Sequence, residues 1–435
     1  MQATGAIEPD QALEAESSDD VKQRPNPPAF LLLCLLCLCH QPVQADALRL
    51  VDVERLLPAN REIKAAERAI EGARAGVVVA AQAPNPTISY AALSINPRNG
   101  LGIGMTHDKR TDQIVALSQL VERGDKRTLR RETAEALVGA AVSDGADVRR
   151  QQRLAVHHAY FELKAAQERK RLLDDTLQLY RGSQAAMATR QAAGDVAAVD
   201  ASRVRVEAAR AENDARAATA ALSSARRTLA YLIGRDDEEV EAVDRWPEVT
   251  PVALELADPE RRPDVRAARA RFAAADRARE LARSLQTRDV TVGGQIERHE
   301  PDPGVTFGIT LSIPLFTNYY YEGEVARAES DVEAARESLE KTVALARTEM
   351  ARAVTELTAA IDRLHRLDDE VLPEARGVAE AAEFAYAKGA IGLTDLLDAR
   401  RTLRAVELDS VNARLDHAKA RSAWLAASEW ESVAP

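Results

Sequence analysis

The stretch Val305–Ile313, with the sequence VTFGITLSI, alternates strictly between two kinds of side chain. Positions 305, 307, 309, 311 and 313 are apolar, and the residues between them are threonine, glycine or serine. This period of two predicts a strand with one apolar face and one small, polar face. Such a strand suits a barrel wall between lipid and water, but it also suits a half-buried hairpin of a soluble protein.

Similar runs occur at matched places in both halves of the chain. The segment Asn60-Arg-Glu-Ile-Lys-Ala-Ala resembles Arg262-Pro-Asp-Val-Arg-Ala-Ala, 202 residues later. A short β-like run begins at Thr87, and its counterpart begins at Asp289, also 202 residues later. Near the ends of the two halves, the motif that begins at Gly194 resembles the one that begins at Gly392. Repeats in the same order indicate duplication. We expect a first repeat over 46–250, with strands about 86–93 and 112–121, and a second over 251–435, with strands about 289–297 and 305–315.

Long helical patterns fill the rest of each repeat. One runs without proline over 67 residues, Arg127 to Ala193, and would be about 100 Å long at 1.5 Å per residue. Its counterpart, Glu324 to Lys388, contains Pro373, where we expect a kink. Four patterns of about half that length predict further helices, two stacked end to end beside each long one: 48–83, 198–232, 253–287 and 395–427.

The helices alone also fit a soluble coiled-coil rod, but a rod does not explain a hairpin inserted in each repeat. A hairpin in lipid must have every backbone edge group paired, and four strands are too few to close a barrel. Three chains would supply twelve strands. The predicted fold is therefore mainly α with a small β part: a duplicated helix–β-hairpin–helix protomer with long antiparallel coiled-coil helices and four strands, which must oligomerise if the strands span a membrane.

Residues 1–45 predict a secretory signal peptide. Lys22 and Arg24 precede the short apolar run 30–39, and small residues before Asp46 predict cleavage after Ala45. The three cysteines lie in that run, each after a leucine, so we expect neither lipidation nor a disulfide in the mature chain. Residues 1–20 fit no signal peptide, and we expect translation to begin near Val21.

Other function classes find little support in the sequence. The net charge is −11 with both signs interspersed, which disfavours nucleic acid as a partner. Gly100, Gly102 and Gly104 lack the strand-to-helix context of a phosphate loop, so we expect them in a loop tip. His157 and His158 are adjacent on a helix and point about 100° apart, which makes a poor chelate. We predict no enzyme activity, no cofactor and no metal site.

Three motifs resemble the TolC family of outer-membrane efflux proteins over about 48–427. Ile313-Pro-Leu-Phe leads through Gly323-Glu324 into a helix, and Tyr386-Ala-Lys-Gly-Ala-Ile-Gly-Leu-Thr-Asp-Leu-Leu-Asp-Ala ends at residue 399. Gln119-Leu-Val-Glu-Arg-Gly-Asp-Lys-Arg127 is most similar to the heavy-metal, CzcC-like branch, although Leu120 replaces the usual proline.

The resemblance implies a homotrimer, with a trimeric 12-stranded β-barrel and an α-helical tunnel, in the outer membrane of a Gram-negative bacterium. It would be in contact with lipid and have a large periplasmic part. Its partners would be a periplasmic adaptor (membrane fusion) protein and an inner-membrane pump, expected to be of the resistance-nodulation-division type. The exported substrate would be metal cations first, or drugs and other small molecules. The alternative function is a soluble periplasmic coiled-coil adaptor or scaffold without a pore.

The resemblance also indicates a periplasmic entrance near the turns that contain Gly194 and Gly389 to Gly392. Asp395 and Asp398 share a helix face and match acids that ring the entrance in the family, and Tyr386 matches a tyrosine of its closing network. Asp200 is the first-repeat equivalent of Asp398 and could join the ring. Ile391 stands where the family has the network's basic partner, so the closing contacts must differ. The other interpretation is that these acids only stabilise a helix N-terminus. With the turns near Gly194 and Gly389 in the periplasm, loops 94–111 and 297–304 would face outside.

Overall fold

The computed structural model describes residues 46–95, 111–235, 240–249, 258–299 and 304–428, all within one compact unit that spans Ala45–Pro435. The predicted signal peptide with its cysteines, and the glycines of 100–104, lie outside the described residues. Among the described helices, none has an apolar stretch long enough to cross a bilayer.

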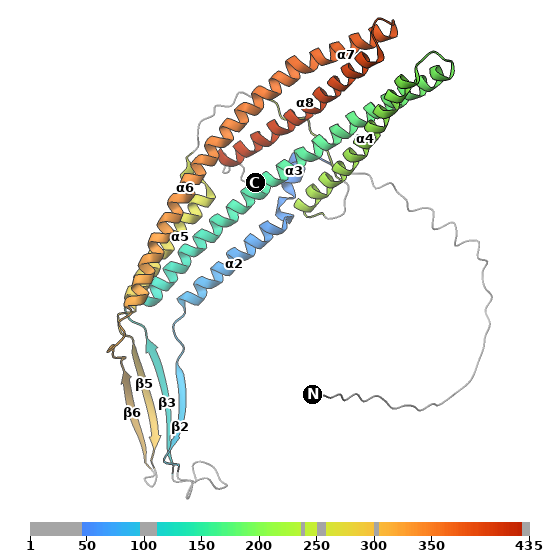
Figure 1. The fold of residues 1–435 in the computed structure, drawn as a ribbon. Helices are drawn as coiled ribbons and strands as arrows, with labels where there is room; N and C mark the ends of the chain where they lie inside the picture. The colour runs from blue at the N-terminus through green and yellow to red at the C-terminus, as the bar shows by residue number, and fades with distance from the viewer. Residues whose placement is uncertain (1–45, 96–110, 236–239, 250–257, 300–303, 429–435) are drawn as a thin grey trace, which may run out of the picture. The chain divides into compact units, whose positions relative to one another are not determined.

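Two long helical paths form the frame of this unit. α3 (Lys126–Ala192) is unbroken over 67 residues. α2 (Arg61–Ala81) and α4 (Ala198–Leu232) pack along its two halves. In the second repeat, α6 (Glu322–His365) continues through a π-helical turn, Arg366–Val371, into α7 (Leu372–Ala387). α5 (Pro263–Ser284) packs on α6, and α8 (Leu393–Ser428) packs on both α6 and α7 (Figure 1).

The π turn replaces the simple proline kink that the sequence suggests. Pro373 has no N–H to donate, and its ring crowds the carbonyl of Asp369 four residues earlier. The chain widens just before it, so that the N–H of Leu372 donates to the carbonyl of Leu367. A wider turn here aims the Asp368 carboxylate at α8, where Arg414 Nε donates to it at 2.8 Å.

Two of the expected half-length helices are shorter than predicted. The pattern over 48–83 breaks into α1 (Leu50–Arg55), a 3-10 turn (Leu57–Ala59) and α2. Pro58 interrupts the first segment, and the Asn60 side chain accepts from two backbone N–H groups and starts α2 afresh. In the second repeat a 3-10 turn (Pro259–Arg261) precedes α5, which begins at Pro263 because proline is favoured in a first turn.

The core lies where α3 meets α1, α2, α4 and α8. Tyr160, Leu163 and Leu229 are fully buried there. Short strands β1 (Asp46–Leu48) and β4 (Val240–Ala242) pair in parallel beside it, and the Tyr160 hydroxyl donates to the carbonyl of Leu48 at 3.1 Å. This cluster joins the start of the first repeat to the chain that follows α4.

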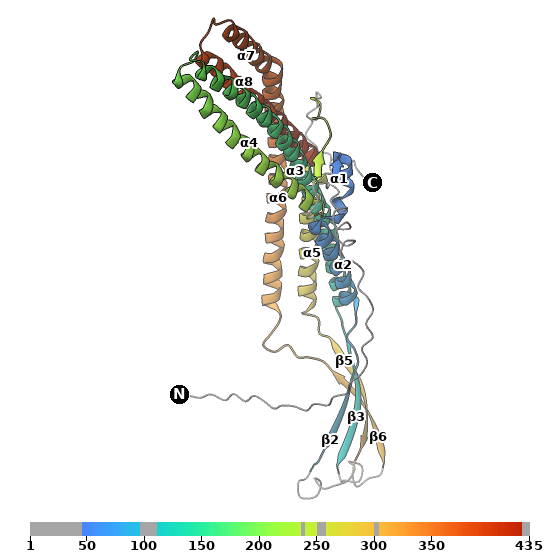
Figure 2. The same ribbon diagram turned by 90° about the vertical axis from the view of Figure 1, so that its right-hand side faces the viewer.

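Four antiparallel strands, in the order β2-β3-β5-β6, extend from one end of the helices (Figure 2). Their bounds are Thr87–Leu93, Asp112–Val121, Val290–Arg298 and Val305–Ser312, within three residues of the predicted runs. β6 ends before the expected residue 315 because Pro314 cannot donate to a ladder.

Candidate channel wall and entrance

The sheet has two chemically distinct faces, as its register shows. Across the four strands, Tyr90, Val115, Ile296 and Phe307 form one row, and Ile88, Leu117, Gly294 and Ile309 form the next. These apolar side chains are strongly exposed, Ile309 to 91% and Phe307 to 81%. A single chain therefore leaves a broad apolar surface uncovered, which marks it as a surface for lipid or another apolar partner.

The opposite face is lined mainly by small and polar residues, with Leu93, Ile114 and Leu120 as its large apolar members. Ser118, Gly293 and Thr310 form one of its rows, and Ala116, Gln295 and Gly308 form the next. A Cβ at position 308 would lie 2.9 Å from the Gln295 side chain, so glycine there makes room for that amide. This face suits contact with water.

A junction of ion pairs ties the strands to the helices. Arg130 and Glu122 form a bidentate pair, and buried Lys126 Nζ lies 2.7 Å from the Asp289 carboxylate and 2.8 Å from the Thr287 carbonyl. Gly124 has a φ of +72°, and a Cβ on it would meet Thr287 at 2.8 Å. The motif at Gln119–Arg127 thus joins β3 and α3 of the first repeat to β5 of the second, a role that the motif alone does not disclose.

At the other end of the helices, two glycine turns close the helical hairpins. Gly194 follows α3 with a φ of +83°, and Gly389 follows α7 with a φ of +75°. In both turns a backbone N–H reaches back five residues, Asp195 to Arg190 and Ala390 to Ala385, which is a helix ending that favours glycine. Gly392 directly precedes α8, and its N–H donates to the Asp395 carboxylate at 3.2 Å.

The two acids on α8 have different partners. Asp395 accepts only from that backbone N–H among the bonds of the described residues, so it caps its own helix. Asp398 lies 2.8 Å from Arg401, whose other nitrogen lies 2.7 Å from Glu207 on α4. Asp200 pairs with Arg203 at 3.3 Å, and Arg203 reaches Thr394 of α8 at 3.1 Å.

Glu207 is a member of this network that sequence reasoning missed. Its side chain is only 4% exposed, and the hydrogen bond from Arg401 holds its pKa below the usual value, assisted by further arginine charges. The signal was present, because Glu207 interrupts the stripe of Ala201, Val204, Ala208 and Ala211 that packs inward. Half-buried Tyr386 does not join the network, since its hydroxyl has no hydrogen-bond partner among the described residues.

Two further arginines of α8 reach towards the first repeat. Arg404 pairs with Asp214 of α4 at 3.0 Å, and Arg400 donates to the hydroxyl of Ser183 on α3 at 3.2 Å. Together with Arg401 they place three guanidinium groups between α8 and the α3–α4 hairpin. These polar contacts lie beside a buried apolar cluster in which Leu397 of α8 packs with residues of α3 and α4, so both kinds of contact hold this end of the molecule together.

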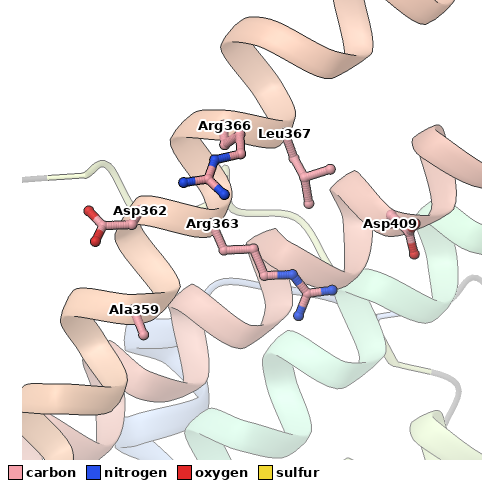
Figure 3. Close-up of a pocket in the computed structure, with 6 residues that line it drawn as sticks. All are labelled: Ala359, Asp362, Arg363, Arg366, Leu367 and Asp409. Carbon is pink, nitrogen blue, oxygen red and sulfur yellow. The ribbon is translucent and has the colours of Figure 1, made fainter.

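The histidines and acidic residues of the described ranges form no metal-ligand grouping. His157 and His158 diverge as expected: one contacts Glu54 at 2.6 Å, and the other contacts the carbonyl of Lys419 at 3.3 Å. No three histidine, cysteine or acidic residues of those ranges lie close enough to hold a metal ion. An open hollow of about 480 Å³ lies where α6, the π turn and α8 meet (Figure 3), and it carries charges of both signs. Its lining consists of Ala359, Asp362, Arg363, Arg366, Leu367 and Asp409.

Comparison with known proteins gives a consistent answer. The family model described as outer membrane efflux protein matches residues 53–235 and 259–427. The cobalt-zinc-cadmium resistance protein CzcC of Cupriavidus metallidurans is 29% identical over 358 residues, which cover 79% of this chain and 81% of CzcC.

Solved channels share the fold. The outer-membrane channel OprN superposes with a TM-score of 0.74 at 22% identity, and the match covers 88% of this chain and 90% of the OprN chain. The transmembrane channel protein CusC superposes with a TM-score of 0.73 at 16% identity, over 87% and 92%.

Proposed function

The chain belongs to the outer membrane efflux protein family, and from that premise we propose that three copies form the outer-membrane exit channel of a tripartite efflux system. The four strands of each copy would contribute to a closed twelve-stranded barrel, and the helices would form a tunnel in the periplasm. The role is transport without catalysis. Residues 1–45 would be removed during export, and 46–250 and 251–435 would be the two halves of a duplicated protomer.

The two-faced sheet is the observation that carries this proposal. Its apolar face runs across all four strands, and its other face is mainly small and polar, as expected of a wall between lipid and water. β2 and β6 each pair on one side only among the described strands. An unpaired edge in lipid costs several kcal/mol per backbone group, so β6 of one copy should pair with β2 of the next.

Divalent metal cations are the substrate class that we favour. The support is the likeness to CzcC, whose name states cobalt, zinc and cadmium resistance, together with the acidic residues near the α7–α8 turn. Drugs and other small molecules remain the alternative. The partners would be a periplasmic adaptor and an inner-membrane pump of the resistance-nodulation-division type.

We place the periplasmic entrance at the α3–α4 and α7–α8 turns. Asp395, Asp398 and Asp200 would ring it in the trimer, with Tyr386 nearby. The Arg401–Glu207 pair, which links α8 to α4 at 2.7 Å, would supply the closing contact for which Ile391 lacks a basic group. Loosening that pair should let the α7–α8 hairpin move away from α4.

Membrane fractionation and cysteine labelling test the channel proposal together. The protein should be extracted from outer membranes as a detergent-stable trimer. Without the signal peptide the chain has no cysteine, so Ile95→Cys, beyond β2, should react with an impermeant maleimide in intact cells. The matched control is Ala390→Cys, in the α7–α8 turn, which should react only after the outer membrane is opened.

The opposite labelling pattern would invert the orientation, and a soluble monomer would favour the adaptor alternative. For the substrate class, deletion of the gene should lower the concentration of zinc, cobalt or cadmium that cells tolerate. Unchanged metal tolerance with increased drug sensitivity would make drugs the substrate class in place of metals, and it would not contradict the proposed channel.

A further inference from the structure

A histidine lies between two carboxylates at the far end of the sheet from the helices. His299 follows the last residue of β5; its Nε2 is 2.9 Å from Glu297 of β5, and its Nδ1 is 3.4 Å from Asp112 of β3. Asp112 also accepts a hydrogen bond from the Ser94 hydroxyl. The two acids flank opposite sides of the ring, so they cannot share one metal ion with it, but each senses the charge of the ring.

The strand register places the cluster on the small, polar face. Glu297 pairs with Ile114 and Thr306, and alternation puts its side chain on the face that carries Gln295 and Gly293. Asp112 begins β3 two residues before Ile114 and shares that face. In the proposed barrel this face borders the water-filled interior, so all three groups would line its outer end.

Little else in the described strands would mask the charge of the ring. β6 (Val305–Ser312) has no ionisable side chain, and in β2 (Thr87–Leu93) Tyr90 is the one such residue and lies on the apolar face. Arg298 alternates to that apolar face as well. The hydrogen bond to Glu297, aided by Asp112, raises the pKa of His299.

The protonation state of His299 therefore sets the net charge of the cluster. With an imidazolium, Asp112 and Glu297 leave one negative charge per chain. Because the pKa is raised, this state persists above the pH at which an ordinary histidine loses its proton. Above the raised pKa the cluster carries two negative charges.

From this geometry we propose that His299 determines the ion selectivity of the outer end of the channel. The inference rests on the proposed trimer, in which three clusters would face one axis and their net charge would double on deprotonation. Acidic rings favour cations in channels, so cation selectivity should rise with pH.

Reversal potentials of purified trimers in planar bilayers under a KCl gradient test the proposal between about pH 5.5 and 9. Carboxylates remain ionised in that range. The K⁺/Cl⁻ permeability ratio of the wild type should rise about twofold with pH. His299→Gln should give the high ratio at every pH, and His299→Arg, which fixes the positive charge, should give the low ratio at every pH.

Opposite shifts by the two variants cannot come from a shared folding defect. His107→Gln, which removes the one histidine in the sequence between β2 and β3, is the matched control and should keep the wild-type pH dependence. A flat wild-type profile, or an unchanged profile in His299→Gln, would overturn the assignment and leave the channel standing. Trimers that carry no current at all would overturn the proposed function and this inference with it.

Discussion

Replacing Ile309 by arginine is the most direct test of the channel wall. Ile309 is the fifth of the eight residues of β6, so it lies near the middle of the strand, and its side chain is 91% exposed in the single chain. If that face meets lipid, a charge at mid-bilayer should cost about 2–4 kcal/mol of insertion free energy. At 1.4 kcal/mol per factor of ten, the insertion equilibrium would fall roughly 30- to 800-fold.

The neighbouring residue supplies the control. Thr310 lies on the other face, opposite Gly293, and an arginine there would extend into the proposed water-filled interior. Thr310→Arg should therefore insert like the wild type. Both variants change a residue of similar position in the same strand, so they share any defect in export or strand formation.

Folding into lipid vesicles against urea, followed by protease protection of the strands, measures the difference. On a soluble protein, a side chain as exposed as Ile309 would accept arginine with little effect. Equal insertion of the two variants would therefore show that this face does not meet lipid, and it would favour the half-buried hairpin of a soluble protein. Better insertion of Ile309→Arg than of Thr310→Arg would mean that the face with Thr310 meets lipid and the face with Ile309 meets water.

Further changes test the entrance and the strand–helix junction. Asp395→Asn combined with Asp398→Asn should weaken cation selectivity in bilayers and relieve block by trivalent cations; acids that only cap α8 would instead lower stability by about 0.3–1 kcal/mol each and leave conductance alone. Glu207→Gln should raise the conductance of single channels by weakening the contact between α8 and α4, and an unchanged conductance would count against that contact as the closing device. Because Arg401 lowers the pKa of Glu207, the contact is retained above that lowered pKa and lost only as pH falls through it, so this contact should contribute no change in conductance down to the ordinary glutamate range. Lys126→Met should cost roughly 2–3 kcal/mol in urea unfolding, since the Thr287 carbonyl loses this donor and the Asp289 carboxylate loses its cation and keeps the backbone N–H of Arg123; a stability equal to the wild type would show that the junction does not stabilise the fold.

The sequence predicts the strands well because a sheet between two environments obeys a simple local rule. Alternation from Val305 to Leu311 identifies both faces of β6, and the register confirms the same alternation in its neighbours. The long helix from Lys126 to Ala192 is equally readable, since nothing in that stretch interrupts it. Breaks at Pro58 and at the π turn were harder to predict, because a proline can kink, end or widen a helix according to its tertiary contacts.

The contacts at the proposed entrance could be predicted only in part, because they join residues far apart in the sequence. Spacing alone puts Asp395 and Asp398 on one face of α8. It cannot show that Arg401, one turn further on, is shared with Glu207, which lies 194 residues earlier. A charged residue in the inward stripe of α4 is the local sign of such a contact, since a carboxylate is buried only where a cation meets it.

This sharing gives the two acids of α8 unequal weight in any cation filter. Arg401 compensates part of the charge of Asp398, and the same guanidinium satisfies buried Glu207. Asp395 meets a backbone N–H at the start of its own helix and no cationic side chain among the described residues. At the proposed entrance, no cationic side chain of the described residues would therefore offset its charge. The resemblance treats the two positions alike, whereas at the proposed entrance their contacts would make Asp395 the stronger attractor of cations and Asp398 a part of the contact between the two repeats.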